Sequence, residues 1–268
     1  MIRDITIGQY YSVDSTIHRL DPRVKILGTL AYMISLFTFR DFAGYAVAVL
    51  FFALVLALSK VPFSYAARGL KPIFILMAFT AFLNLFWTDG TVFFRMGALA
   101  VTWEGLYKMI YISLRLILLV LGSSLMTLTT TPNQLTDGLE RIFGLLKVFR
   151  VPVHEMAMMM SIALRFIPIL IEETNRIMKA QTARGADFES GNLLQRLRNM
   201  LPLLIPLFVS AIRRATDLAL AMDSRCYHGG AGRTKMYPLR YRMNDFVAYG
   251  CLVAYIVILR AVVWVCPW

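Results

Sequence analysis

Long apolar runs are the feature that most constrains the fold of this chain. A helix needs about 20 predominantly apolar residues to cross the hydrocarbon core of a bilayer. Five runs approach or reach that length, at roughly 25–39, 42–58, 72–87, 107–128 and 246–265. The composition agrees, since 58% of residues are hydrophobic, 16% are charged and the mean hydropathy is +0.63. We therefore predict an all-α integral membrane protein with about five transmembrane helices.

The region between residues 129 and 245 breaks this pattern, because charged side chains recur inside its apolar stretches, as at Arg165. Isolated spanning helices tolerate such charges poorly. We interpret the region as a cytoplasmic platform of three long amphipathic helices, at roughly 132–149, 152–185 and 193–227. The predicted organisation is a cytoplasmic N-terminal segment with four spans (1–128), a cytoplasmic domain (129–245) and a final transmembrane helix (246–268).

The distribution of basic residues predicts the orientation. Of the 28 Lys and Arg residues, 16 lie in 129–245 and four in the first 25 residues. Basic loops of membrane proteins stay in the cytoplasm. We therefore expect the N-terminus and the platform on the cytoplasmic side and the C-terminus outside. The same bias removes nucleic acid from the expected partners, because basic cytoplasmic loops account for the net charge of +12.

Two short arginine triplets close the two longest predicted platform helices, 41 positions apart. Their members are Ala183, Arg184 and Gly185 in the first, and Ser224, Arg225 and Cys226 in the second. A single triplet of this kind is typical of a helix C-terminus, where glycine favours the left-handed turn and arginine complements the helix dipole. Repetition favours a second use, because each guanidinium offers five donors that can bind a carboxylate or helix-end carbonyls of a partner.

An N-terminal signature accompanies the triplets and, with them, resembles a known family. Its residues are Asp14, Ser15, His18, Asp21, Pro22 and Arg23. Signature and triplets together resemble the transmembrane (T) component of energy-coupling factor (ECF) transporters, the EcfT, CbiQ and BioN family. The resemblance spans nearly the entire chain. The second triplet differs from the family's Ala-Arg-Gly motif at both residues beside the arginine. The role of the arginine therefore carries over to Arg225 more safely than the roles of the neighbouring residues carry over to Ser224 and Cys226.

The resemblance implies a scaffold of an ABC-type importer in a bacterial cell membrane. Two cytoplasmic ATPase subunits, identical or homologous, would bind the arginine-bearing helix ends and would use ATP with magnesium. A separate membrane-embedded S-component would capture a vitamin or metal ion. The present chain would then bind no cofactor and would couple ATPase motion to the S-component. The substrate would be recognised by another polypeptide, so this sequence does not specify it.

An enzymatic role finds little support in the residues. The glycine-rich segment 229–235 lacks the G-x-x-x-x-G-K-[ST] order of a phosphate-binding loop. The three histidines are scattered without metal-ligand spacing, so no metal site is predicted. The alternative interpretation is an unrelated membrane-embedded enzyme or channel in which the arginine triplets serve only as helix caps.

Three local features leave more than one interpretation. Arg115, inside an apolar run, could serve a function or could pair with a carboxylate or a backbone carbonyl. Ala67-Arg68-Gly69 has the same sequence as the first triplet but lies outside the long helices, and we assign it no coupling role. A methionine cluster could pack in a core or accept another membrane protein. Its members are Met156, Met158, Met159, Met160 and Met178.

Overall fold

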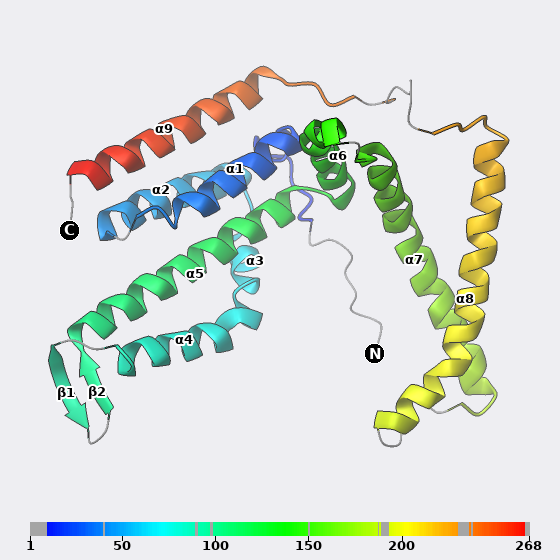
Figure 1. Cartoon of the computed structure of the whole chain (residues 1–268), viewed down its shortest axis with the longest axis horizontal. Coiled ribbons are helices and arrows are strands. Elements are labelled where there is room, and N and C mark those ends of the chain that lie inside the picture. Colours follow the sequence, from blue (N-terminus) through cyan, green and yellow to red (C-terminus); the bar gives the residue numbers. More distant parts are fainter. Residues whose placement is uncertain are drawn as a thin grey trace. The chain divides into compact units, whose positions relative to one another are not determined.

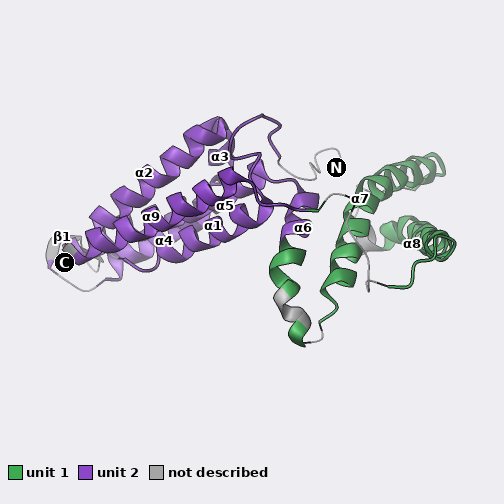
Figure 2. Cartoon of the chain, turned by 90° about the horizontal axis from the view of Figure 1, so that it is seen from above, with its two compact units in different colours: residues 1–7, 139–238 green, residues 8–138, 239–268 purple. Residues whose placement is uncertain are grey.

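The computed structural model describes residues 10–39, 41–88, 91–96, 99–149, 151–186, 188, 193–229, 236 and 238–265. The chain divides into two compact units, shown in different colours in Figure 2. The larger contains residues 8–138 and 239–268, and the smaller contains residues 1–7 and 139–238.

The larger unit is a set of apolar helices with one small hairpin. Its helices are α1 (Pro22–Ser35), α2 (Phe42–Ser59), α3 (Phe63–Arg68), the short 3-10 helix η1 (Lys71–Ile73), α4 (Phe74–Phe86), α5 (Trp103–Thr129) and α9 (Met243–Val265). In Figure 1, α4, α5, the α1–α2 pair and α9 follow one another as layers. Strands β1 (Val92–Met96) and β2 (Leu99–Thr102) form an antiparallel hairpin before α5 that the sequence analysis did not predict.

The core of the larger unit forms where α1, α2, α5 and α9 meet. Its buried side chains are mostly large and apolar and include Leu36, Phe39, Tyr45, Leu121, Tyr255 and Leu259. Polar atoms inside it are paired, since Ser35 Oγ lies 2.8 Å from Tyr255 Oη and donates to the carbonyl of Tyr32. Such pairing is required because an unpaired polar group is costly away from water.

The described residues contain five helices long and apolar enough to cross a membrane, as expected in number, but the set differs from the predicted one. The predicted first span, 25–39, forms α1, which has only 14 residues and is too short to qualify. Asp21 caps α1 at one end, and the chain turns after Ser35 toward α2. Conversely α7 (Val153–Ala183), predicted as a platform helix, meets the length and hydropathy of a span.

The smaller unit contains the helices of the predicted platform, and their boundaries agree closely with the expected ranges. They are α6 (Pro132–Ile142), which begins in the larger unit, the 3-10 helix η2 (Phe143–Phe149), α7, and α8 (Leu193–Asp223). Both long helices continue through internal prolines, at Pro168 in α7 and at Pro202 and Pro206 in α8. In Figure 1, α7 and α8 cross, and their C-terminal ends lie on different sides of the crossing.

Candidate functional site

The two arginine triplets end their helices with the same backbone turn. After α7, Gly185 has a φ of +91° and its N–H donates to Thr182, while the Ala186 N–H donates to Gln181. After α8, Cys226 has a φ of +56° and its N–H donates to Asp223, while the Tyr227 N–H donates to Met222. These paired bonds define a Schellman motif, in which the third residue of the triplet takes the left-handed conformation.

Arg184 and Arg225 occupy the same position in the two motifs, the last residue before the left-handed one. Both are exposed. Within the described part of the chain, neither guanidinium has a hydrogen-bond or ion-pair partner. The caps are made by backbone groups alone, so each planar five-donor fork is left available for carboxylate or carbonyl oxygens of another molecule.

A further arginine triplet, Ala67-Arg68-Gly69, does not share this geometry. Gly69 has an ordinary right-handed helical conformation, with a φ of −62°. An added Cβ at Gly69 would clash with Ser124 Oγ of α5, so a side chain here would force Ser124 to move. Arg68 lies over the ring of Tyr65, at 4.3 Å from its centroid. Backbone conformation therefore separates this triplet from the other two, which a search for sequence motifs could not do.

Polar contacts of Glu173 join the two arginine-bearing helices. Glu173 of α7 accepts a hydrogen bond of 2.7 Å from Ser210 Oγ and forms an ion pair with Arg214, both on α8. Glu173 lies 11 residues before Arg184, and Arg214 lies 11 residues before Arg225 (184 − 173 = 225 − 214). At a rise of about 1.5 Å per residue, each arginine is about 16 Å along its helix from this contact. This contact could not be predicted from the sequence, because nothing in the sequence pairs these positions.

Part of the N-terminal signature forms a local network that joins the start of the chain to the end of α5. The His18 Nε2 lies 3.0 Å from the carbonyl of Tyr11, and its Nδ1 lies 2.7 Å from Ser15 Oγ. Since a carbonyl only accepts, Nε2 carries the proton and Ser15 donates to Nδ1. Burial and the charge of Lys25 lower the pKa of His18, while the bond to Tyr11 opposes them, so the neutral ring fits this arrangement.

Lys25 and Asp14 complete the surroundings of this network. The Lys25 ammonium donates to the carbonyls of His18 and Thr129, at 3.0 and 2.8 Å, so it fastens the signature to the last residue of α5. Asp14 lies on the surface and pairs with Arg19, whose Nε donates to it at 2.7 Å. The hydrogen bond from Arg19 is the main reason that the pKa of Asp14 is lowered.

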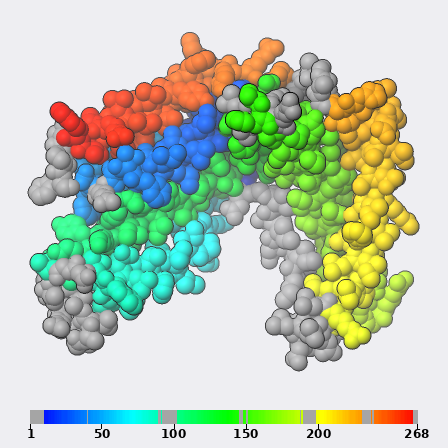
Figure 3. All heavy atoms as spheres, in the orientation of Figure 1, coloured from blue at the N-terminus to red at the C-terminus, as the bar shows by residue number. Residues whose placement is uncertain are grey.

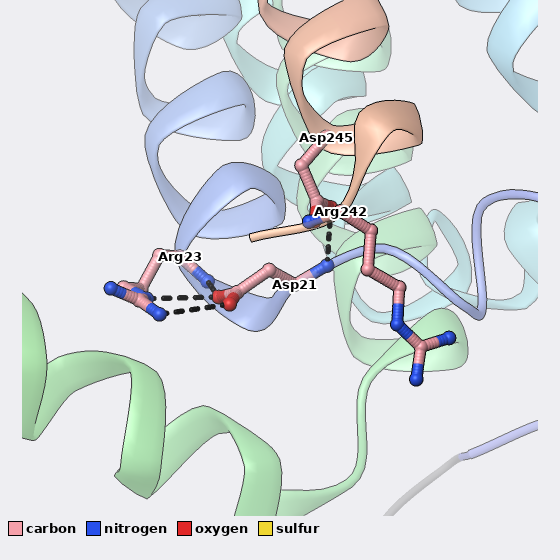
Figure 4. A network of polar contacts seen from close by, with 4 residues as sticks. All are labelled: Asp21, Arg23, Arg242 and Asp245. Carbon is pink, nitrogen blue, oxygen red and sulfur yellow. Dashed lines mark hydrogen bonds and ion pairs between the residues drawn. The ribbon is translucent and has the colours of Figure 1, made fainter. Parts of the chain in front are cut away.

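The rest of the signature connects α1 to α9, as Figure 4 shows. The Asp21 side chain caps α1 by accepting from the Arg23 N–H at 2.9 Å, and it also pairs with the Arg23 guanidinium at 3.0 Å. Pro22 takes the first helical position, where its missing N–H costs nothing. The Asp21 N–H in turn donates to the carboxylate of Asp245 at 2.8 Å, and the Arg242 N–H donates to the same carboxylate at 2.6 Å.

Asp245 is therefore a structural residue that the sequence analysis did not single out. Its only local signal is a carboxylate in the first turn of an apolar helix, which is common. Its partner Asp21 lies 224 positions away. Apart from Asp14, which pairs with Arg19 on the surface, the signature residues lie in the networks that join the ends of α1, α5 and α9.

Arg115 belongs to the structural core and not to a separate site. Its Nε donates to Tyr45 Oη at 3.1 Å, and its guanidinium donates to the carbonyl of Phe39 and to Tyr111. Tyr111 Oη also donates to the Phe39 carbonyl, at 3.1 Å. Arg115 therefore donates to a backbone carbonyl in the connection between α1 and α2. Of the interpretations left open by the sequence, this is the one in which Arg115 pairs with a backbone carbonyl.

The described residues bring together no group of three or more His, Cys, Asp or Glu side chains that could hold a metal ion. His154 pairs instead with Glu140 of α6, at 2.9 Å. The glycine-rich segment lies outside the described residues from 230 to 235. The guanidinium groups at the two exposed helix ends can donate hydrogen bonds to acceptor oxygens of other macromolecules.

Comparison with known proteins gives consistent matches over nearly the whole chain. The CbiQ family, described as "Cobalt transport protein", matches residues 14–237, which include the signature and both triplets. Three relatives carry the name "Energy-coupling factor transporter transmembrane protein EcfT". That of Thermosediminibacter oceani is 55% identical over 251 residues, covering 92% of this chain and 94% of the relative. The Clostridium kluyveri protein is 53% identical, with 94% of each chain covered, and the Bacillus subtilis protein is 45% identical, with 97% and 100% covered.

Proposed function

The chain belongs to the CbiQ family and is the transmembrane component of an energy-coupling factor transporter, and from this we propose that it couples two cytoplasmic ABC ATPases to a substrate-binding S-component. In this proposal it is not itself an enzyme, and the partners use ATP with magnesium. The transported substrate is a vitamin or a metal ion that the S-component selects. The platform and the N-terminus lie in the cytoplasm, and the C-terminus lies outside. This orientation requires α1, although it has only 14 residues, to cross the membrane together with α2, α4 and α5.

The observation that carries the proposal is the equivalence of the two helix ends. Arg184 and Arg225 occupy the same position in the same motif, both are exposed, and each lies about 16 Å from the Glu173–Arg214 contact. Two equivalent ends suit a partner that presents the same surface twice, as a pair of identical or homologous ATPase subunits does. An arginine at a helix C-terminus also complements the helix dipole, so the proposal depends on the recurrence of the same exposed geometry at two helix ends.

The bond to each ATPase would come from the guanidinium. Its donors can bind a carboxylate in a bidentate manner or cap the carbonyls at a helix end. The small residues beside each arginine, Ala183 and Gly185 in one triplet and Ser224 and Cys226 in the other, would let the ATPase surface approach closely. When the two ATPases close on ATP and open after hydrolysis, the two ends of the α7–α8 pair would be moved together or apart.

Exposed apolar stripes on the platform supply a surface for the S-component. On α8 the exposed stripe repeats at helical spacing and consists of Leu201, Leu204, Ile205, Phe208 and Ile212. The opposite side of α8 carries Leu203, which is buried, and the residues that bind Glu173. On α7, Met156, Met159 and Met160 are also exposed, which favours the partner-binding interpretation of the methionine cluster over core packing. An apolar, adaptable face of this kind fits another membrane protein.

The test is co-purification of the transporter complex in mild detergent. We expect Arg184→Glu and Arg225→Glu each to weaken ATPase binding by roughly 30-fold or more, because losing a buried charge pair costs about 2 kcal/mol or more. The double variant should lose both subunits and coupled ATP hydrolysis while it elutes as a folded, monodisperse protein. Arg213→Glu is the matched control, since Arg213 is an exposed arginine of α8 away from its end.

Conservative replacement separates charge from geometry. Arg184→Lys keeps the charge but loses the bidentate fork, so we expect weak binding of ATPases and partial coupling. The proposal is wrong if the double variant retains both ATPases with full coupled hydrolysis, or if no ATPase accompanies the wild-type chain.

A further inference from the structure

A narrow apolar groove runs through the larger unit between α1 and α2. The two helices contact each other near Tyr32, whose Oη lies 3.5 Å from the carbonyl of Ala48, and residues of both line the groove. The gap has a volume of about 220 Å³ and is closed on two sides by α5 and α9. Its lining is mostly apolar and includes Val24, Gly28, Leu54, Leu58, Leu125 and Val247.

The groove is open to the surroundings along part of its length. Leu54 is 54% exposed, Leu58 is 46% exposed and Val247 is 60% exposed, although all three line it. Figure 3 shows this region of the surface, where the atoms of α9 adjoin those of α1 and α2. Because α2 and α9 are both candidate membrane spans, the opening faces hydrocarbon in the membrane.

A polar pocket continues the groove at one end. It has a volume of about 270 Å³, and its lining consists of Asp14, Ser15, Thr16, Arg19, Lys60 and Asn244. Thr16 and Asn244 line both hollows, so the two are contiguous. The pocket lies where α2 ends, at Lys60, and where α9 begins, in the turn that holds Asn244. Ends of membrane helices lie at the depth of lipid headgroups.

The polar pocket has an excess of positive charge. Arg19 is already paired with Asp14. Among the described residues, the Lys60 ammonium has no hydrogen-bond or ion-pair partner. The pocket therefore offers one uncompensated cation together with the hydroxyl of Thr16 and the amide of Asn244, which suits a phosphate group.

We propose that this combined site binds one phospholipid with an anionic headgroup, with an acyl chain in the groove and the phosphate beside Lys60 and Arg19. An apolar channel that ends in a basic pocket at headgroup depth matches the two halves of such a lipid. A helix from a partner protein is about 10 Å across and does not fit a cavity of about 220 Å³. The lipid would fill the space between α1 and α2 that their side chains leave open. This site does not depend on the binding of ATPases.

Gly28 gives a direct way to fill the groove. A Cβ added there would meet no atom within 4 Å, so the backbone at Gly28 has room for a side chain, and Gly28→Leu should place the rest of its atoms in the groove. Gly250→Leu is the matched control, because Gly250 is also a helical glycine with open space and does not line the groove. Lys60→Gln removes the free cation, and Lys71→Gln removes an exposed lysine elsewhere in the same unit.

The experiment is native mass spectrometry of the full chain in detergent, incubated with phosphatidylglycerol or phosphatidylcholine of the same acyl composition. The wild type should retain one phosphatidylglycerol, at least about fivefold more than phosphatidylcholine. Gly28→Leu should lower lipid retention by about tenfold or more, and Gly250→Leu should not. Lys60→Gln should bring the ratio of the two lipids close to one, and Lys71→Gln should leave it unchanged.

Two results would overturn the proposal. Equal lipid retention by wild type and a folded Gly28→Leu variant would show that no acyl chain occupies the groove. Equal retention of the two lipids by wild type, or an unchanged preference in Lys60→Gln, would remove the headgroup site. Since Lys60 is exposed, its variant should fold even if Gly28→Leu does not.

Discussion

Replacement of Asp245 should destabilise the larger unit more than replacement of an ordinary acidic residue in the first turn of a helix. The residue is only 2% exposed, and its carboxylate accepts from the N–H groups of Asp21 and Arg242. Asp245→Ala leaves both donors without an acceptor. The Asp21 N–H is buried, so leaving it without an acceptor costs about 1–3 kcal/mol. Water can reach the exposed Arg242, so the second loss should cost no more than a helix cap, about 0.5–1 kcal/mol.

The sum predicts that Asp245→Ala lowers the free energy of unfolding by about 1.5–4 kcal/mol. Asp245→Asn keeps one carbonyl acceptor and should lower it by about half as much. The measurement is reversible unfolding of the purified chain by SDS in mixed micelles, followed by tryptophan fluorescence. Asp41→Ala is the matched control, because Asp41 also begins an apolar helix but its side chain makes no cap hydrogen bond.

We expect Asp41→Ala to change the free energy of unfolding by no more than about 0.5 kcal/mol. The reasoning fails if Asp245→Ala falls within this same range. It fails equally if the two alanine variants lose the same stability, because the buried bond to Asp21 would then contribute nothing of its own.

Three further predictions concern single positions. At the ends of the platform helices, Gly185→Ala should cost about 1 kcal/mol of unfolding free energy, because a Cβ is disfavoured at positive φ, whereas Cys226→Gly should cost less or stabilise. SDS titration of both variants checks this order, and the reverse order contradicts it. Gly69→Ala should cost about 1–3 kcal/mol through its clash with Ser124 Oγ, and Ser124→Ala in the same chain should restore most of it, by the same titration. For His18, whose pKa is lowered, stability is full above its unfolded value of about 6.5 and is lost as the pH falls through the folded pKa. Thermal melting should therefore shift less between about pH 7.5 and about pH 5 in His18→Gln than in wild type.

Much of the helical organisation could be read from local sequence. The apolar runs gave α2, α4, α5 and α9, and the amphipathic stretches gave α6, α7 and α8. The length of an apolar run did not reliably predict whether its helix is long enough to span a membrane. The 25–39 run forms a helix of only 14 residues, while α7 is long and apolar enough to span despite its charges. Hydropathy counts residues, and it does not record where a cap or a turn ends the helix.

The two triplets illustrate where local signals stop being sufficient. Ala-Arg-Gly occurs twice in the sequence, at 67–69 and at 183–185, yet only the second occurrence has the left-handed turn. Ser224-Arg225-Cys226 has that turn without a glycine. Similarity of the triplet sequence was therefore a weaker predictor of the left-handed turn than position at the end of a long helix.

Membrane embedding, the positions of the long helices and the arginine-bearing helix ends follow from the order of residues alone, because hydropathy and capping act within a few turns of chain. The partners of Arg115, Glu173 and Asp245 do not, since their contacts join positions 70, 41 and 224 residues apart. Such pairs form only after helices have packed, when burial forces each polar group to find an acceptor or donor on whichever helix is adjacent. Packing likewise creates the groove beside Gly28, whose walls come from four helices.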